Sequence, residues 1–331
     1  MNKIHESIHK LVEEKEPNIC EITVIRDNKK IYEDYWHGYK KDDALNVMSV
    51  TKSIVALLTG IAIDRGYIKG VDEKVISFFP DYVTKRGEKT IYDVTIRHLL
   101  TMTAPYKYKS EPWTRVCSSG DWTKEALDLL GGRNGITNEF KYATLGIQIM
   151  NGILESATGE PVISFANQNL FEPLGIPEVK LHGESDKDDQ FNYLMNKNPR
   201  IHEWYNDPKD AVTAGWGISL SATDLAKIGS MLANWGEYEG KQILSREWIS
   251  QMTTPYQTLG ETFGYMSYGY LWWIPHIEKG IFAAIGDGGN VIYVNPSKKL
   301  AVGVAATFKP RIFDRVDFIE KEILKLLDFK V

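Results

Sequence analysis

Apolar positions repeat at strand spacing near both ends of the chain, and this pattern predicts one sheet built from both ends. Residues 3–16 carry apolar side chains at helical spacing, so we expect a helix that Pro17 ends. Residues 20–25 and 30–36 are typical of strands, and the short turn-prone segment between them predicts an antiparallel hairpin. The strand pattern returns in four consecutive segments, at residues 268–274, 281–285, 291–294 and 300–306.

Helical spacing dominates the middle of the chain. Residues 54–63 are almost all apolar or small, which is typical of a helix buried on every side, and Gly66 ends it. We find no good strand pair between residues 70 and 200, and the polar stretch 183–200 is expected to be a surface loop. Other helices are predicted near residues 95–102, 122–130, 142–157, 161–170 and 316–327.

A further strand is expected at residues 214–220, just before a helix. Ser221 and Asp224 form an acidic variant of the capping box, which opens a helix that runs to about Asn234. The order of elements therefore predicts an α/β (α+β) fold. We expect an antiparallel sheet flanked by N-terminal and C-terminal helices, with a mostly helical region inserted between the two halves of the sheet.

The same order of elements predicts two domains. Residues 1–70 and 205–331 are expected to form a sheet-and-helix domain, and residues 71–204 an inserted helical domain. We expect the active site between them.

Composition narrows the functional classes. The 331 residues are 43% hydrophobic and 25% charged, as in soluble globular proteins. A formal net charge of −5 argues against nucleic acid or an anionic membrane as partner. No run is long enough to span a bilayer and the first residues lack a secretory signal, so a cytoplasmic protein is expected. Cys20 and Cys117 form no metal or redox motif and are expected in the core.

Ser49 and Lys52 lie where a loop enters the apolar helix, and a spacing of three residues places them on one helix face. About one S-x-x-K match is expected by chance, and a second one, Ser7 and Lys10, lies on the polar side of the first helix. Lys52 differs because burying its charge is costly, and burial can keep it neutral enough to accept a proton from Ser49. A structural lysine that extends its amine to solvent is the open alternative.

Residues 5–9 match H-E-x-x-H, the motif of zinc hydrolases. His5 and His9 would share a helix face, with Glu6 as the base. A zinc site also needs a third ligand and a walled cleft, whereas this motif lies on an outer helix whose buried stripe is Ile4 and Ile8. A zinc-dependent hydrolase is therefore the minor alternative.

Gly286, Asp287, Gly288 and Gly289 form a glycine-rich turn between two predicted strands. The default interpretation is a tight hairpin turn. Such a turn also allows backbone amides to approach a substrate closely, as an oxyanion hole requires. The chain has no G-x-S-x-G elbow, no Walker loop and no G-x-G-x-x-G between a strand and a helix, so an α/β-hydrolase triad and a nucleotide site lose support.

A series of short segments matches the motifs of one known protein family, in the same order along most of the chain. The segments are MSVTKS at 48–53, TIRHLLTMT at 95–103, FKYATLG at 140–146, FEPLG at 171–175, AGWG at 214–217, SATDLA at 221–226, LSREW at 244–248, YGYLWW at 268–273, GDGGN at 286–290 and IYVNP at 292–296. Through them, residues 36–308 resemble the serine β-lactamase-related hydrolases with the penicillin-recognition fold. The most similar branch contains class C β-lactamases, D-aminopeptidases, family VIII esterases and 6-aminohexanoate-dimer hydrolases.

This resemblance implies a two-step acyl transfer. Ser49 would be the nucleophile, and Lys52 would help to deprotonate it. Tyr142 would shuttle protons to the leaving group and support deacylation, and we expect the charge of Lys52 to favour its phenolate. The backbone N–H of Ser49 and one from the turn at 286–290 would hold the oxyanion.

Two positions depart from the family pattern. Thr144 stands where the family's Tyr-x-Asn motif has asparagine, so an amide that orients substrate and lysine is missing. Asp287 occupies or neighbours the position of the cation in the family's K-T-G or H-x-G motif. An anion there repels the carboxylate of a β-lactam or peptide and favours a neutral ester or a substrate amine.

The sequence therefore predicts a serine hydrolase that acts on an ester or amide bond of a small, peptide-like or other substrate. No cofactor, metal, nucleic acid or membrane is expected as a partner, and the sequence does not indicate an oligomeric state. The alternative is a non-catalytic ligand-binding protein of the same fold, which the departures at Thr144 and Asp287 favour. Candidate residues for lining the cleft are Trp113, Trp122, Trp204 and Trp216.

Overall fold

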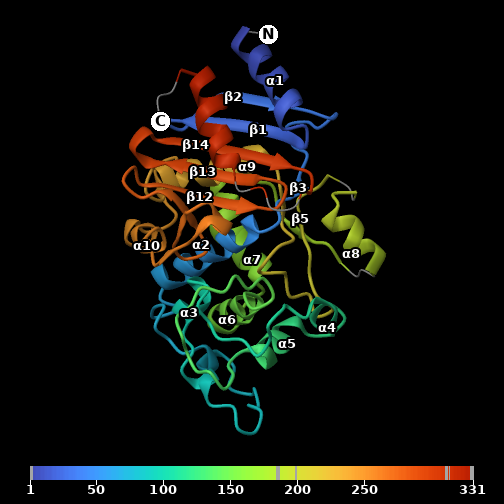
Figure 1. The fold of residues 1–331 in the computed structure, drawn as a ribbon, viewed down its shortest axis with the longest axis vertical. Coiled ribbons are helices and arrows are strands. Elements are labelled where there is room, and N and C mark those ends of the chain that lie inside the picture. The colour runs from blue at the N-terminus through green and yellow to red at the C-terminus, as the bar shows by residue number, and fades with distance from the viewer. Residues whose placement is uncertain (1–2, 184–186, 198–199, 310–311, 313, 329–331) are drawn as a thin grey trace.

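The computed structural model describes residues 3–183, 187–197, 200–309, 312 and 314–328, and its centre is an eight-stranded antiparallel sheet. The strand order is β2-β1-β14-β13-β12-β11-β10-β9, so the two ends of the chain meet inside one sheet (Figure 1). The strands are β1 (Ile19–Arg26), β2 (Lys29–Tyr35), β9 (Gln257–Thr258), β10 (Ser267–Tyr268), β11 (Trp273–His276), β12 (Ile281–Gly286), β13 (Asn290–Asn295) and β14 (Leu300–Ala306).

Short strands and helices complete the fold. Two-residue strands pair as β3 (Leu45–Asn46) with β6 (Ser219–Leu220), β4 (Lys180–Leu181) with β5 (Glu203–Trp204), and β7 (Glu237–Tyr238) with β8 (Lys241–Gln242). The helices are α1 (Lys3–Lys15), α2 (Val50–Asp64), α3 (Ile96–Leu100), α4 (Trp113–Cys117), α5 (Trp122–Leu129), α6 (Gln148–Thr158), α7 (Val162–Ala166), α8 (Lys187–Leu194), α9 (Ala222–Ala233), α10 (Arg246–Met252) and α11 (Arg315–Phe318). Wider π-helical turns extend α7 and α11.

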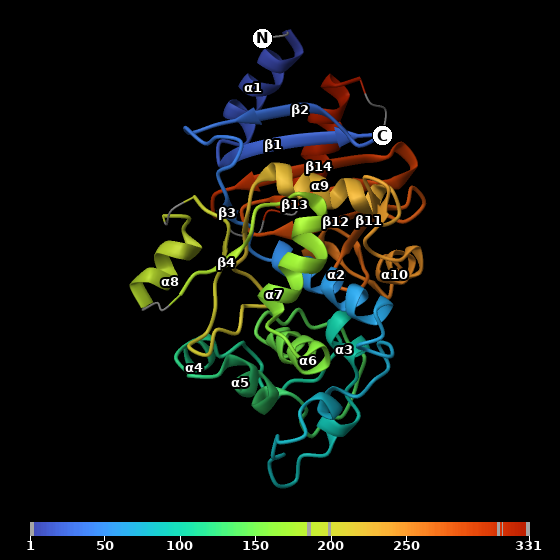
Figure 2. The same ribbon diagram turned by 180° about the vertical axis from the view of Figure 1, so that it is seen from behind.

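Helices cover both faces of the sheet, which explains why its central strands are buried at every position. Strands β12, β13 and β14 are buried along their whole length, whereas the edge strand β2 has exposed positions. Helix α9 packs on β14, β1 and β13 on one face, and the C-terminal helix lies on the other (Figures 1 and 2). Helix α2 lies between this sheet and α6, so nearly all its side chains are buried, as its apolar sequence predicts.

Helices α3 to α6 lie together on the side of α2 that faces away from the sheet, and α7 lies alongside α2 (Figure 2). The predicted fold class, an antiparallel sheet with flanking helices and a mostly helical insertion, is confirmed. The boundaries of the two domains stay a prediction. In the ranges that the structure describes, no helix combines the length and apolar character needed to span a membrane.

Several predicted elements differ from the structure. The single strand expected at 268–274 is wrong, because the chain reverses at Leu271, where φ is +59°, and forms β10 and β11 instead. Of the strand expected at 214–220, only Ser219–Leu220 is formed. The loop expected at 183–200, part of which lies outside the described residues, contains helix α8.

The helix expected at 142–157 begins only at Gln148. The backbone N–H of Lys141 donates to the Met102 carbonyl at 2.7 Å, and the N–H of Ala143 points to the Met102 sulfur at 3.4 Å. These contacts bind the segment around Tyr142 to a neighbouring loop, so this segment does not form the first turns of the predicted helix. Tertiary contacts of this kind have no periodic signature in the sequence.

Candidate active site

Ser49 and Lys52 meet at the start of α2. Ser49 is the residue that caps the helix, and Lys52 follows one turn later with only 1% of its surface exposed. The Lys52 Nζ donates to the Ser49 Oγ at 2.9 Å and to the backbone carbonyl of Gly215 at 2.6 Å. The lysine therefore does not extend its amine to solvent, which was the structural alternative, and it is directed at the serine hydroxyl.

The loop before α2 is held in a strained shape that presents Ser49. Met48 has φ of +52°, a left-handed conformation that a residue with a side chain rarely adopts. The side-chain oxygen of Asn46 accepts from the N–H groups of Met48 (3.0 Å) and Gly217 (3.2 Å), and Thr51 Oγ1 donates to the Met48 carbonyl at 2.7 Å. These bonds fix the loop on both sides of the strained residue.

Burial determines the charge of Lys52. It lowers the pKa of the ammonium from its ordinary 10.5 to about 7, although the carboxylates of Glu111 and Asp287 act in the opposite direction. A lysine with a pKa of about 7 is half neutral at neutral pH, so it can accept a proton from a hydroxyl that lies in hydrogen-bond contact.

Tyr142 faces the same lysine. The Lys52 Nζ lies 4.9 Å from the centre of the Tyr142 ring, which stacks on Trp273 at 6.0 Å and meets Tyr268 edge-on at 6.5 Å. These two aromatic residues come from β11 and β10, so the sheet supports the tyrosine of the helical region.

The pKa of Tyr142 is raised, chiefly because the hydroxyl is buried; hydrogen bonding to Ser49 opposes this shift, and the carboxylates of Asp287 and Glu111 add to it. The expectation that Lys52 makes a phenolate accessible is therefore wrong. Burial and two nearby negative charges outweigh a lysine that is itself half neutral. Tyr142 is a neutral hydroxyl in the resting site, able to donate and accept in one relay.

The glycine turn at the end of β12 lies directly against Ser49. A Cβ atom on Gly286 would stand 2.3 Å from the Val47 carbonyl oxygen and 3.0 Å from the Ser49 backbone nitrogen. Only glycine allows this approach. The N–H groups of Gly288 and Gly289 donate to the carbonyls of Lys309 (2.6 Å) and Gly286 (3.0 Å). Both N–H groups are therefore used in hydrogen bonds that hold the turn.

A buried arginine supports this turn from behind. Arg315 has no exposed surface, and its guanidinium pairs with Glu16 at 3.1 Å and donates to the Gly288 carbonyl at 3.3 Å. The Asn18 side-chain amide donates to the same carbonyl at 2.7 Å. A Cβ atom on Gly289 would stand 2.4 Å from the Arg315 Nε. Three separate segments of the chain therefore determine the position of the turn.

Thr144 also lies at the site. A Cβ atom on Gly215 would be 2.5 Å from the Thr144 carbonyl oxygen, so the loop after Tyr142 packs directly on the residue whose carbonyl binds Lys52. The structure thus brings together Ser49, Lys52, Tyr142 and the turn that begins at Gly286.

Sequence reasoning missed a carboxylate and two aromatic side chains. Glu111 accepts from the Leu145 N–H at 2.7 Å, burial raises its pKa, and its charge acts on Lys52. It lies in an irregular loop with no motif to mark it. Trp273 and Tyr268 belong to apolar strand segments, where aromatic residues ordinarily indicate core packing.

The four tryptophans proposed to line the cleft differ in their exposure. Trp204 is completely buried, so the prediction that it lines a cleft is wrong. Trp113 is 43% exposed on α4. Trp122 and Trp216 are nearly buried and stack with Tyr205 in a separate aromatic cluster.

The two histidines near the N-terminus fasten α1 to β2. The His9 ring lies 2.9 Å from an oxygen of Asp34 and stacks on Trp36, and the His5 ring lies 3.0 Å from the Glu33 carbonyl. Across the part of the chain that the structure describes, no three His, Cys, Asp or Glu side chains are grouped to hold a metal ion. These contacts give the H-E-x-x-H residues a packing role.

Solved structures of known proteins share this fold. A family VIII carboxylesterase superposes with a TM-score of 0.71 and 17% identity, over 98% of this chain and 96% of that one. The octameric penicillin-binding protein homologue from Pyrococcus abyssi gives a TM-score of 0.68 and 21% identity, over 100% and 78% of the two chains. The fold is therefore the penicillin-recognition fold of the serine β-lactamase-related hydrolases.

The sequence comparison identifies the family to which the chain belongs. Residues 20–322 match the Beta-lactamase family, and the chain belongs to it. Among characterised relatives, the 6-aminohexanoate-dimer hydrolase of Paenarthrobacter ureafaciens is 25% identical over 298 residues, which cover 82% of this chain and 68% of that protein. The resemblance seen in the sequence motifs is confirmed, and the protein is a hydrolase of this family.

Proposed function

We propose that the protein is a serine hydrolase that cleaves an ester or amide bond of a small substrate through an acyl-enzyme on Ser49. The observation that carries this proposal is the 2.9 Å hydrogen bond from the Lys52 Nζ to the Ser49 Oγ, made by a buried lysine whose pKa is about 7. A nucleophile in contact with a base that is neutral near physiological pH is the arrangement that acyl transfer needs.

Acylation begins when neutral Lys52 accepts the hydroxyl proton as the Ser49 oxygen attacks the substrate carbonyl. The negative charge that develops on the carbonyl oxygen is stabilised by the Ser49 N–H and a second amide at the Gly286–Asp287 corner. Preorganised donors of this kind typically contribute about 10²–10³ in rate. The close packing of Gly286 on Ser49 supports this assignment.

Tyr142 then supplies a proton to the leaving group and receives the proton that Lys52 holds. Its position above Lys52 and its hydrogen bonding to Ser49 support this relay. In deacylation a water molecule attacks the acyl carbonyl, its proton passes to Tyr142 and Lys52, and the Ser49 hydroxyl is restored. General acid–base catalysis at each step is worth about 10²–10⁴ in rate.

The charges around the site support neutral or amine-bearing substrates over carboxylates. Asp287 and Glu111 both act on Lys52, so a substrate carboxylate bound between them would be repelled. The known relatives include a family VIII carboxylesterase and a 6-aminohexanoate-dimer hydrolase, whose names denote ester and amide cleavage. The site would lie between the sheet-and-helix domain (1–70 and 205–331), which supplies Ser49 and Lys52, and the helical domain (71–204), which supplies Tyr142.

A fluorophosphonate probe tests the nucleophile. We expect stoichiometric labelling of wild type at Ser49 and none in Ser49→Ala, with Ser7→Ala as the matched control because Ser7 belongs to the other S-x-x-K sequence. A panel of p-nitrophenyl esters, D-amino-acid anilides and nitrocefin then ranks substrates, with nitrocefin expected last. Equal turnover by Ser49→Ala, or no label on Ser49, would contradict the proposal and leave a ligand-binding protein of the same fold.

A further inference from the structure

A separate cavity of about 1100 Å³ lies in the helical region. Its walls come from the segments 85–90, 103–109 and 131–141. Ser49, Lys52 and Tyr142 are not among the described residues that line it, although its wall ends at Lys141, directly before Tyr142. Its volume is that of a pocket for a small organic molecule.

The lining of this cavity is strongly basic. The cationic side chains are Lys85, Arg86, Lys89, Lys107, Lys109, Arg133 and Lys141. Among the described residues that line the cavity, two carboxylates, Glu88 and Glu139, accompany these seven cations, in a protein whose formal net charge is −5. The positive charge is therefore concentrated locally, against the sign of the whole molecule.

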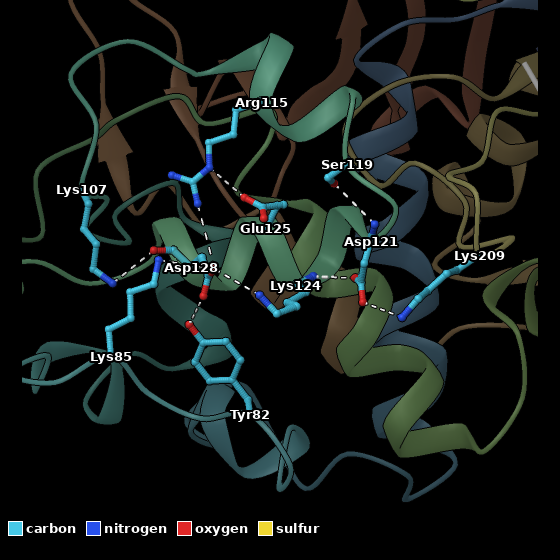
Figure 3. Close-up of polar contacts among 10 residues, drawn as sticks. All are labelled: Tyr82, Lys85, Lys107, Arg115, Ser119, Asp121, Lys124, Glu125, Asp128 and Lys209. Atoms are coloured by element: carbon cyan, nitrogen blue, oxygen red, sulfur yellow. Dashed lines mark hydrogen bonds and ion pairs between the residues drawn. The ribbon is translucent and has the colours of Figure 1, made fainter. Parts of the chain in front are cut away.

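Three of the cations are held by the protein itself. Lys85 lies 3.4 Å from the Asp128 carboxylate, and Lys107 donates to the Asp128 backbone carbonyl at 3.3 Å (Figure 3). Lys107 also pairs with Glu88 at 3.1 Å. Lys141 donates to the Tyr108 carbonyl, with its Nζ 4.3 Å from the centre of that ring. These bonds hold the cationic walls in place.

Asp128 holds Lys85 and Lys107 of one cavity wall in place. It also accepts from Tyr82 at 2.7 Å and from Lys124 at 3.2 Å, and Arg115 approaches it at 4.0 Å (Figure 3). Its side chain is 10% exposed, so this carboxylate is already shared among several donors and leaves little charge to offset the cavity.

The other four cations are exposed and make no ion pair within the described part of the chain. They are Arg86, Lys89, Lys109 and Arg133. Of the two carboxylates, Glu88 has a side chain that is only 7% exposed and accepts from the Ile91 N–H as well as pairing with Lys107. Glu139 is then the one lining carboxylate that faces solvent, and it cannot balance four guanidinium and ammonium groups.

We propose that this cavity binds a small polyanion, a molecule that carries two or more phosphate or carboxylate groups. Each of the three lining segments contributes arginine or lysine side chains to the same cavity. Several anionic groups of one ligand can therefore be contacted at once. The proposal goes beyond Ser49 chemistry and does not depend on it.

Isothermal titration calorimetry with inorganic tripolyphosphate and with citrate, at low ionic strength, tests the site. We expect saturable one-to-one binding of at least one of them, and the stronger of the two identifies phosphate or carboxylate as the preferred group. The variant Arg86→Gln/Lys109→Gln/Arg133→Gln should weaken this binding about tenfold or more, because charge-assisted contacts are lost. Ser49→Ala should bind as wild type does.

The matched control is Lys29→Gln/Lys241→Gln/Lys298→Gln, which removes the same number of charges from exposed lysines outside the cavity. It should bind the anion as wild type does. Absence of saturation with both anions would overturn the proposal, and so would an equal loss in the control variant, because binding would then follow net charge alone. All substituted arginine and lysine side chains are exposed, and thermal melting verifies that each variant folds.

Discussion

Replacing Lys52 with methionine should stabilise the protein while abolishing its activity. A pKa lowered from 10.5 to about 7 corresponds to a penalty of about 5 kcal/mol for folding with Lys52 charged. Below pH 7 the lysine is charged in both the folded and unfolded chains, so the whole penalty is present. Between pH 7 and 10.5 the unfolded chain keeps its proton and the folded chain does not, so stability rises with pH until the penalty is gone.

Methionine removes the charge but leaves the Gly215 carbonyl without its donor, which costs about 1–3 kcal/mol. Lys52→Met should therefore be more stable than wild type by about 2–4 kcal/mol near pH 6, and by about 3 kcal/mol less than that near pH 9. Urea denaturation of both proteins at the two pH values measures this difference.

Lys10→Met is the matched control, because Lys10 belongs to the other S-x-x-K sequence and is exposed on α1. It should show no change in stability between the two pH values relative to wild type. If Lys52→Met and wild type respond identically to pH, Lys52 does not fold as a buried, partly neutral base, and the proposed mechanism loses its base.

The remaining predictions concern the other groups of the site. The acylation rate should rise with pH to a plateau, with a midpoint near 7, and Glu111→Gln should move that midpoint to lower pH because it removes a charge that favours protonated Lys52. Tyr142→Phe should lower kcat about 10²-fold or more, and more for alkyl esters than for p-nitrophenyl esters, whose leaving group needs no proton. Gly286→Ala should lose about 10² or more in kcat/KM, whereas Gly70→Ala, where a Cβ has open space, should not; equal effects would contradict the oxyanion assignment.

Local patterns were sufficient for much of the fold. The hairpin of β1 and β2, the buried helix α2, the capping box of α9 and the strands β12 to β14 lie within a residue or two of their predictions. Each depends on neighbours in the sequence, through periodic apolar positions or a side chain bonded to a backbone group three residues away. Elements that depend on distant partners were misplaced, as at Leu271, whose N–H donates to the Leu100 carbonyl.

The candidate site divides in the same way. The pair Ser49 and Lys52 follows from helical spacing, and the motifs order Tyr142 and the glycine turn behind it. The amino-acid sequence alone therefore specifies the groups that we propose to act on the substrate. The apolar sequence of helix α2 also indicates that burying Lys52 is costly.

Folding decided the protonation states and the surroundings of those groups. Burial makes Lys52 half neutral against the opposing fields of Glu111 and Asp287, and burial together with those fields keeps Tyr142 protonated; both carboxylates come from distant segments. The approach of Gly286 to Ser49 and the basic cavity likewise arise where separate segments converge. Desolvation and Coulomb interactions depend on distances in space, and these distances are set by packing rather than by order along the chain.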